Sequence, residues 1–216
     1  MRFSKSLVIV FFLLSGCTTI DTITTAFYVP DYKSIGTINV VPASAENNNS
    51  LEFSNYKSQF EKKLSLNGYQ VVKQPSDAKF LAFVGYAISN GEASTGIVPV
   101  FGQTGGGTTY SSGTVYGAGG SASYSGSSYK APTFGAIGAI PVSHTNYTRT
   151  LALEIVDANS IKNGQPSKVY ESKVISTGTC SVFAGVFNEL LESMFKDFPG
   201  ENGGIRNLTL PFNGKC

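Results

Sequence analysis

Residues 90–146 constrain the fold of this chain more than any other stretch. They are dominated by Gly, Ser, Thr and Tyr and contain the runs Gly105-Gly106-Gly107 and Gly117-Ala118-Gly119-Gly120. Such a composition cannot build a hydrophobic core of its own. The core must come from the two flanking blocks, and we expect residues 90–146 to be a long loop or a β-hairpin inserted between them.

Four tyrosines make this insertion the candidate partner-contacting segment. Their spacing follows neither a helical nor a strict strand period. A hairpin would present them to a glycan, to an envelope protein or to a second copy of the chain, whereas the alternative is a mobile loop without a partner. The four residues are Tyr110, Tyr116, Tyr124 and Tyr129.

A second motif in the same stretch, Gly117-x-Gly119-x-x-Ala122, has the spacing of a dinucleotide fingerprint. That fingerprint needs an apolar strand before it and a helix after it. Neither pattern is present, so we expect no nucleotide and no other cofactor.

The first residues indicate export and lipidation. A short basic head is followed by an apolar run over residues 7–14, which is well below the roughly 20 residues of a transmembrane helix and is typical of a signal peptide. The run ends in Leu14-Ser15-Gly16-Cys17, which resembles the lipobox of bacterial lipoproteins. The resemblance implies cleavage of residues 1–16, acylation of Cys17 and stable membrane anchoring by several acyl chains. Because Thr18 stands where inner-membrane lipoproteins usually have Asp, it also implies the outer membrane, facing the periplasm.

The charge balance of the mature chain excludes nucleic-acid binding. Removing residues 1–16 takes away Arg2 and Lys5 but no acid, so the 16 basic residues become 14 and equal the 14 acidic ones. Neither a basic excess nor a basic cluster remains to neutralise phosphates.

Hydrophobic periodicity in the flanking blocks predicts one α+β domain over residues 35–216, preceded by a lipidated tether over residues 17–34. Strands are expected at 35–41, 69–73, 79–88, 147–156 and 169–177. One amphipathic helix follows the capping residues 47–50, and a second follows Ser181 with a large aromatic stripe. We therefore expect a mainly antiparallel sheet of about five strands, with two helices packed on one face and the insertion at 90–146.

Two cysteines remain once Cys17 carries lipid. Cys180 and Cys216 form an even pair, which in an oxidising compartment can be a disulfide. The alternative is two separate thiols, and the sequence does not decide between them.

Short motifs in both blocks resemble a family of uncharacterised bacterial lipoproteins known only as a domain of unknown function. The resemblance covers most of residues 31–200 and implies a fold, but no catalytic residues. The motifs are Gly68-Tyr69, Asp77-Ala78, Leu151-x-Leu153-x-Ile155-x-Asp157, Val169-Tyr170-Glu171 and Phe195-x-x-Phe198-Pro199.

Residue types that carry catalysis are sparse. His144 is the one histidine, no Cys-x-x-Cys spacing occurs, and no Gly-x-Ser-x-Gly elbow is present, so we expect neither a metal site nor an enzyme. The prediction is a lipid-anchored envelope protein with a binding or scaffolding role.

Two other functions stay open. A cell-wall hydrolase would need a carboxylate pair. Only the fold could assemble such a pair from Asp31, Glu46, Glu92 and Asp157. Hairpins from several copies could instead insert together into a membrane, but that needs alternating strands of about 9–11 residues, which residues 115–122 do not supply.

Overall fold

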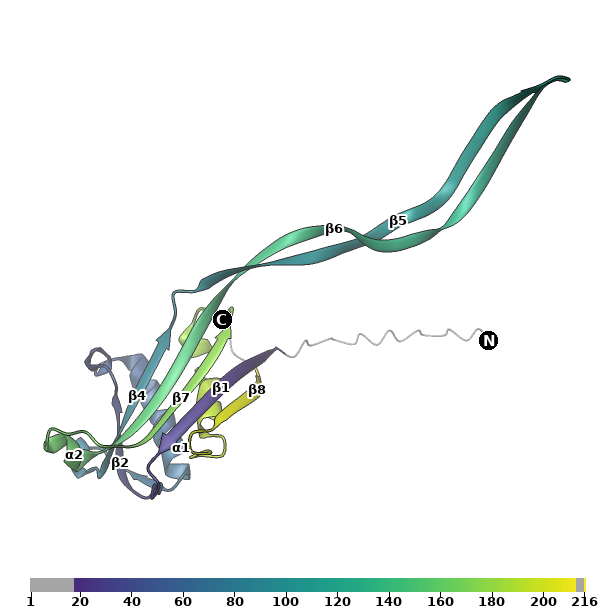
Figure 1. Ribbon diagram of the computed structural model, residues 1–216. Coiled ribbons are helices and arrows are strands. Elements are labelled where there is room, and N and C mark those ends of the chain that lie inside the picture. Colours follow the sequence, from purple (N-terminus) through teal and green to yellow (C-terminus); the bar gives the residue numbers. More distant parts are fainter. Residues whose placement is uncertain (1–17, 213–215) are drawn as a thin grey trace, which may run out of the picture. The chain divides into compact units, whose positions relative to one another are not determined.

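The computed structural model describes residues 18–212 and 216, which form two compact units. One unit, here called the body, comprises the described residues up to Glu92 and from Asn146 onward. The other, here called the hairpin unit, is Ala93–Thr145 (Figure 1). No helix within the described ranges is long and apolar enough to cross a membrane.

A mixed sheet in the order β3-β2-β4-β6-β7-β1-β8 forms the frame of the body. β2 runs parallel to both β3 and β4, while the other neighbours are antiparallel. An eighth strand, β5, pairs with β6 outside this order. The strands are β1 Thr19–Tyr28, β2 Gly36–Pro42, β3 Tyr69–Val71, β4 Phe80–Ile88, β5 Glu92–Gly117, β6 Gly120–Asp157, β7 Lys168–Gly178 and β8 Ile205–Pro211.

The predicted single domain with about five mainly antiparallel strands and two helices on one face is therefore wrong. The sheet has eight strands in mixed orientation, and the described chain contains three α-helices, α1 Leu51–Leu66, α2 Ala158–Lys162 and α3 Phe187–Phe195. Parallel pairing of β2 with β3 and β4 was missed because periodicity reports which residues are buried but not which strands are neighbours.

The expected tether is also wrong, because β1 is an inner strand between β7 and β8. Its inward-facing side chains alternate with exposed ones but include two threonines, so the strand looks polar in sequence. Thr22 and Thr24 are buried, and their hydroxyls hydrogen-bond the hydroxyl of Ser193 on α3 at 2.7 and 2.8 Å. Buried polar groups are tolerated when they are paired in this way.

The helix predictions are confirmed in type. Ser50 caps α1 by accepting a hydrogen bond from the Phe53 amide at 3.2 Å, and the predicted apolar stripe of this helix is buried. Tyr56 of that stripe stacks on Phe187 of α3 with the ring centroids 3.8 Å apart. Burying a phenylalanine such as Phe187 stabilises the fold by about 1.5–3 kcal/mol, so this contact helps to hold α1 and α3 together.

Cys180 and Cys216, left open as a disulfide or two thiols, are joined by a disulfide between residues 36 apart. Beside it lies Arg149, which is 2% exposed. Its guanidinium donates to the Cys180 carbonyl at 3.3 Å and to the Ser176 hydroxyl at 2.9 Å. Burial lowers the pKa of Arg149. Arg149 of β6 is thus hydrogen-bonded both to β7, through Ser176, and to Cys180, one of the two disulfide cysteines.

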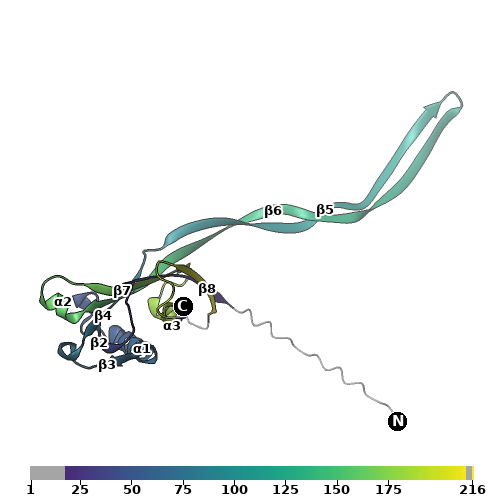
Figure 2. The same ribbon diagram turned by 60° about the horizontal axis from the view of Figure 1, so that its bottom comes forward.

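The hairpin unit consists of β5 and the first part of β6, so of the two alternatives for this stretch the structure has the hairpin. Both views show the two strands running side by side along their length (Figures 1 and 2). Cross-strand hydroxyl pairs join Thr104 to Thr133 at 3.2 Å and Thr114 to Ser123 at 3.3 Å. The residues between the two strands are Ala118 and Gly119.

Candidate interaction surface

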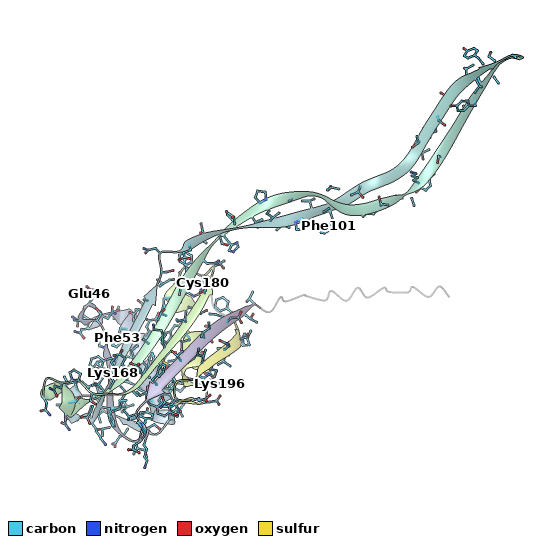
Figure 3. All side chains as sticks on the ribbon, in the orientation of Figure 1. Glu46, Phe53, Phe101, Lys168, Cys180 and Lys196 are labelled. Carbon is cyan, nitrogen blue, oxygen red and sulfur yellow. A yellow bond between two sulfur atoms is a disulfide. The ribbon has the colours of Figure 1, made fainter. Side chains whose placement is uncertain are left out.

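The hairpin unit has no interior. None of residues 93–145 is buried, and Lys130 is the one Asp, Glu, Lys or Arg among them. Side chains stand out from a two-stranded ribbon, as Phe101 does in Figure 3. Monomeric soluble proteins rarely expose large contiguous apolar patches, and those that do use them for binding. The exposed large apolar residues of the unit are Ile97, Val98, Phe101, Tyr110, Val115, Tyr116, Tyr124, Tyr129, Phe134, Ile137, Ile140 and Val142.

The four predicted tyrosines all lie on the hairpin, and all are exposed. Tyr110 and Tyr116 are each 81% exposed, Tyr129 is 69% and Tyr124 is 56%. Tyr124 is the least exposed because its ring lies across Gly113, where a Cβ atom would come within 2.8 Å of a ring carbon. No aromatic pair joins any two of them within the described residues. They are therefore presented separately along the hairpin.

Gly106 marks a change of character along the hairpin. Its φ of +93° favours glycine, and a Cβ atom there would lie 2.5 Å from the Pro132 Cα and 2.6 Å from the Ala131 carbonyl oxygen. Beyond this point lies a stretch without proline or charge, residues 108–129, which we call the distal arm. The remainder of the unit, which we call the base, contains Lys130 and all three prolines, Pro99, Pro132 and Pro141.

Carboxylates for a hydrolase are not assembled. Asp157 caps α2 by accepting from the Asn159 and Ser160 amides, Glu46 lies in a 3-10 turn, and Glu92 is the first residue of β5. Asp31 borders a surface cavity of about 360 Å³ that none of the other three acids lines. Across the described chain, no group of three or more His, Cys, Asp and Glu side chains could hold a metal ion.

One pair of neighbouring carboxylates was not predicted from the sequence. Glu154 of β6 and Glu171 of β7 lie directly opposite each other, and Lys168 bridges them at 2.7 and 3.2 Å. Hydrogen bonding to Glu154 raises the pKa of Lys168. All three side chains are more than 40% exposed, so this is a surface ion network of small energetic weight. Cross-strand register, which periodicity does not report, would have been needed to find it.

The predicted lipid-attachment residue Cys17 lies outside the described residues, but its neighbour is fixed in the body. The Thr18 hydroxyl donates to the Phe212 carbonyl at 3.0 Å, and the Phe212 amide donates to the Thr18 carbonyl at 2.8 Å. Since β1 and β7 are antiparallel, the start of β1 shares one end of the sheet with Gly178, which pairs with Tyr147. Residues 92 and 146, where the chain departs to and returns from the hairpin unit, adjoin that same end.

Comparisons with known proteins identify a family whose function is not described. The model of a family described as a domain of unknown function (DUF4136) matches residues 24–200. No curated protein matches the chain significantly. A crystal structure of a PDZ domain protein from Parabacteroides distasonis is 12% identical, with a TM-score of 0.40, over 89% of this chain. The chain spans 39% of that protein, and a likeness at this level carries no argument.

Proposed function

This chain belongs to the family described as a domain of unknown function, DUF4136, and we propose that it is a lipid-anchored envelope protein that acts by binding or scaffolding rather than by catalysis. The observation that carries this proposal is the hairpin unit, which exposes apolar side chains over its whole length and bears a single charge. Exposed apolar surface of this extent is typical of a site that binds another molecule.

The anchor in this proposal is the acylated Cys17, in the outer membrane and facing the periplasm. The sequence Leu14-Ser15-Gly16-Cys17 supports it. With Thr18 bonded to Phe212, only the one peptide link from Cys17, about 3.8 Å between Cα atoms, separates the lipid from the sheet. The body would then rest on the bilayer by the end that carries Thr18, instead of being lifted from it. The chain enters and leaves the hairpin at that end too.

Lipidation is tested with Cys17→Ser. The variant is expected to lack the acyl chains, which mass spectrometry detects, and to move from the membrane fraction to the soluble periplasm. Thr19→Ser, an exposed conservative change two residues away, is the matched control and stays in the membrane fraction. A Cys17→Ser protein that still pelleted with membranes after a salt wash would refute the anchor.

Binding is tested by capture from detergent-solubilised envelopes. The intact protein is compared with a version in which an Asn-Gly turn replaces the distal arm, and with a version in which its four tyrosines are changed to serine. We expect a component that the intact protein retains and both variants lose. If all three proteins capture the same components, the body or the base of the hairpin carries the binding, and the distal arm is not the binding element.

A further inference from the structure

We infer that the distal arm, residues 108–129, pairs edge to edge with the distal arm of a second copy of this chain, so that the hairpins of neighbouring molecules form a continuous sheet. The inference rests on the proposed function, because it names the partner of the element proposed there to bind. The observation behind it is that the two strands of the distal arm pair only with each other, and that their outer edges carry neither charge nor proline.

The ribbon is incomplete as a sheet. Within the described residues β5 pairs with β6 alone, and residues 120–145 of β6 have no strand partner other than β5. A two-stranded hairpin in water is marginally stable, and a third strand or a covering layer is needed for independent stability. Each outer edge of the arm also presents a row of amide and carbonyl groups, which is a template for another strand.

The body protects its own sheet edges, and the distal arm does not. At one edge of the body, β3 has only three residues. At the other, β8 carries Arg206 and ends at Pro211. Short strands, charges and prolines are the usual means of preventing edge-to-edge association. The base of the hairpin also has them, in Lys130 and its three prolines, whereas the distal arm has none. The distal arm, where we place the contact, is therefore the part whose strand edges lack these protections against edge-to-edge association.

The chemistry of the arm favours a second copy over a different partner. With no charge on it, the arm offers nothing for complementary recognition of an anionic glycan or a charged protein surface. Its side chains are small hydroxyls and glycines interspersed with Tyr110, Tyr116, Tyr124 and Tyr129, and such a surface is complementary to itself. In a two-fold contact, where one residue of the first arm meets a second residue of the other arm, the same two residues also meet with the arms exchanged. Aromatic and hydroxyl pairs across neighbouring strands are stabilising.

The test measures the mass of the lipidated chain in detergent by sedimentation equilibrium over a wide concentration range. We expect the wild type to associate. Ser112→Lys with Ser127→Lys places charge on both strands of the arm and is expected to weaken association at least tenfold. Thr95→Lys with Ala139→Lys adds the same charge to exposed residues of the base and is expected to associate as the wild type does. Circular dichroism verifies that the body of each variant is folded.

A second readout locates the contact. Ser112→Cys is expected to form a disulfide between chains on mild oxidation, and Thr95→Cys is not. A wild type that stays monomeric at every concentration overturns the inference, as does an arm variant that associates like the wild type. A third result would also overturn the inference. If the amides of the distal arm are protected from hydrogen exchange only when phosphatidylethanolamine–phosphatidylglycerol vesicles are added, and the chain is monomeric, then lipid and not a second copy covers the arm. If the wild type is monomeric but removing the arm abolishes capture of another envelope component, the inference falls and the proposed function stands.

Discussion

Thr18 and Phe212 hydrogen-bond each other twice although 194 residues separate them in the sequence. The contact closes β1 against β8 at the end of the sheet where the proposed lipid anchor begins. A segment of this composition, rich in Thr and without apolar runs, has the appearance of a flexible linker. Here it is an inner strand, so the N-terminal residues are part of the stability of the body.

Ser193 should be essential to that arrangement. Its hydroxyl joins both Thr22 and Thr24 beneath α3, and it is fully buried. Ser193→Ala leaves the Thr24 hydroxyl without its partner, and we expect a loss of about 1–3 kcal/mol in the free energy of unfolding. Urea denaturation gives the value. Ser58→Ala removes an exposed hydroxyl of α1 and should change the free energy of unfolding by less than about 0.5 kcal/mol. Equal effects of the two substitutions would show that β1 is not held by this contact.

The disulfide should stabilise the body through the unfolded state. A bond between residues 36 apart lowers the entropy of the unfolded chain by an amount worth about 3–4 kcal/mol in the loop-closure model. Reduction is therefore expected to lower the urea midpoint of the wild type. The double variant Cys180→Ser with Cys216→Ser should begin at the lower midpoint and not respond to dithiothreitol. A midpoint unchanged by reduction in the wild type would mean that the bond does not constrain the unfolded chain.

Gly106 should be required for the hairpin to cross from its base to its distal arm. Gly106→Ala introduces a Cβ atom against the backbone of Ala131 and Pro132 at a φ that disfavours any side chain. We expect faster amide exchange throughout the distal arm. The matched control is Gly138→Ala, where nothing lies within 4 Å of the added Cβ and φ is not positive. Exchange rates that are the same in both variants would show that the arm does not depend on the geometry at Gly106.

Sequence patterns predicted the elements that follow a clean period. The amphipathic helix expected after residues 47–50 is α1, whose buried residues are Phe53, Tyr56, Phe60 and Leu64. The strands expected at 147–156 and 169–177 lie in β6 and β7, which pair antiparallel. The wrong predictions share a cause, which is that they concern contacts between residues distant in the sequence. These predictions are the neighbours of each strand, the parallel pairing of β2 and the inner position of β1. Threonines replace apolar residues on the inward face of β1, and a period based on hydrophobicity does not register them.

The sequence indicated which residues make up the candidate interaction surface, but not whether they form a loop or a hairpin. Composition alone indicated that residues 90–146 build no core, and the four tyrosines were identified from it. Whether the stretch is a loop or a hairpin depends on pairing along its whole length, for which short runs such as residues 115–122 give no clear signal. The Glu154–Lys168–Glu171 network needed the register of β6 against β7.

Four tyrosines that are buried or half-buried should make the body sensitive to alkaline pH. Burial raises the pKa of Tyr170 to about 12, and it also raises the pKa of Tyr32, Tyr56 and Tyr69. In the unfolded chain these phenols ionise near pH 10, so above that pH the unfolded state releases protons that the folded state retains. Their contribution to stability is fully present below about pH 10 and is lost as pH rises toward about 12.

Urea midpoints measured between pH 8 and pH 11.5 are expected to be flat at first and then to fall. Tyr170→Phe keeps the ring that packs beside Phe198 but removes the ionisable hydroxyl, so its midpoint should fall less steeply than that of the wild type. Tyr110→Phe makes the same chemical change on an exposed residue of the hairpin unit and should follow the wild-type curve. If Tyr170→Phe and the wild type lose stability with the same slope, the alkaline transition arises from groups other than this buried phenol.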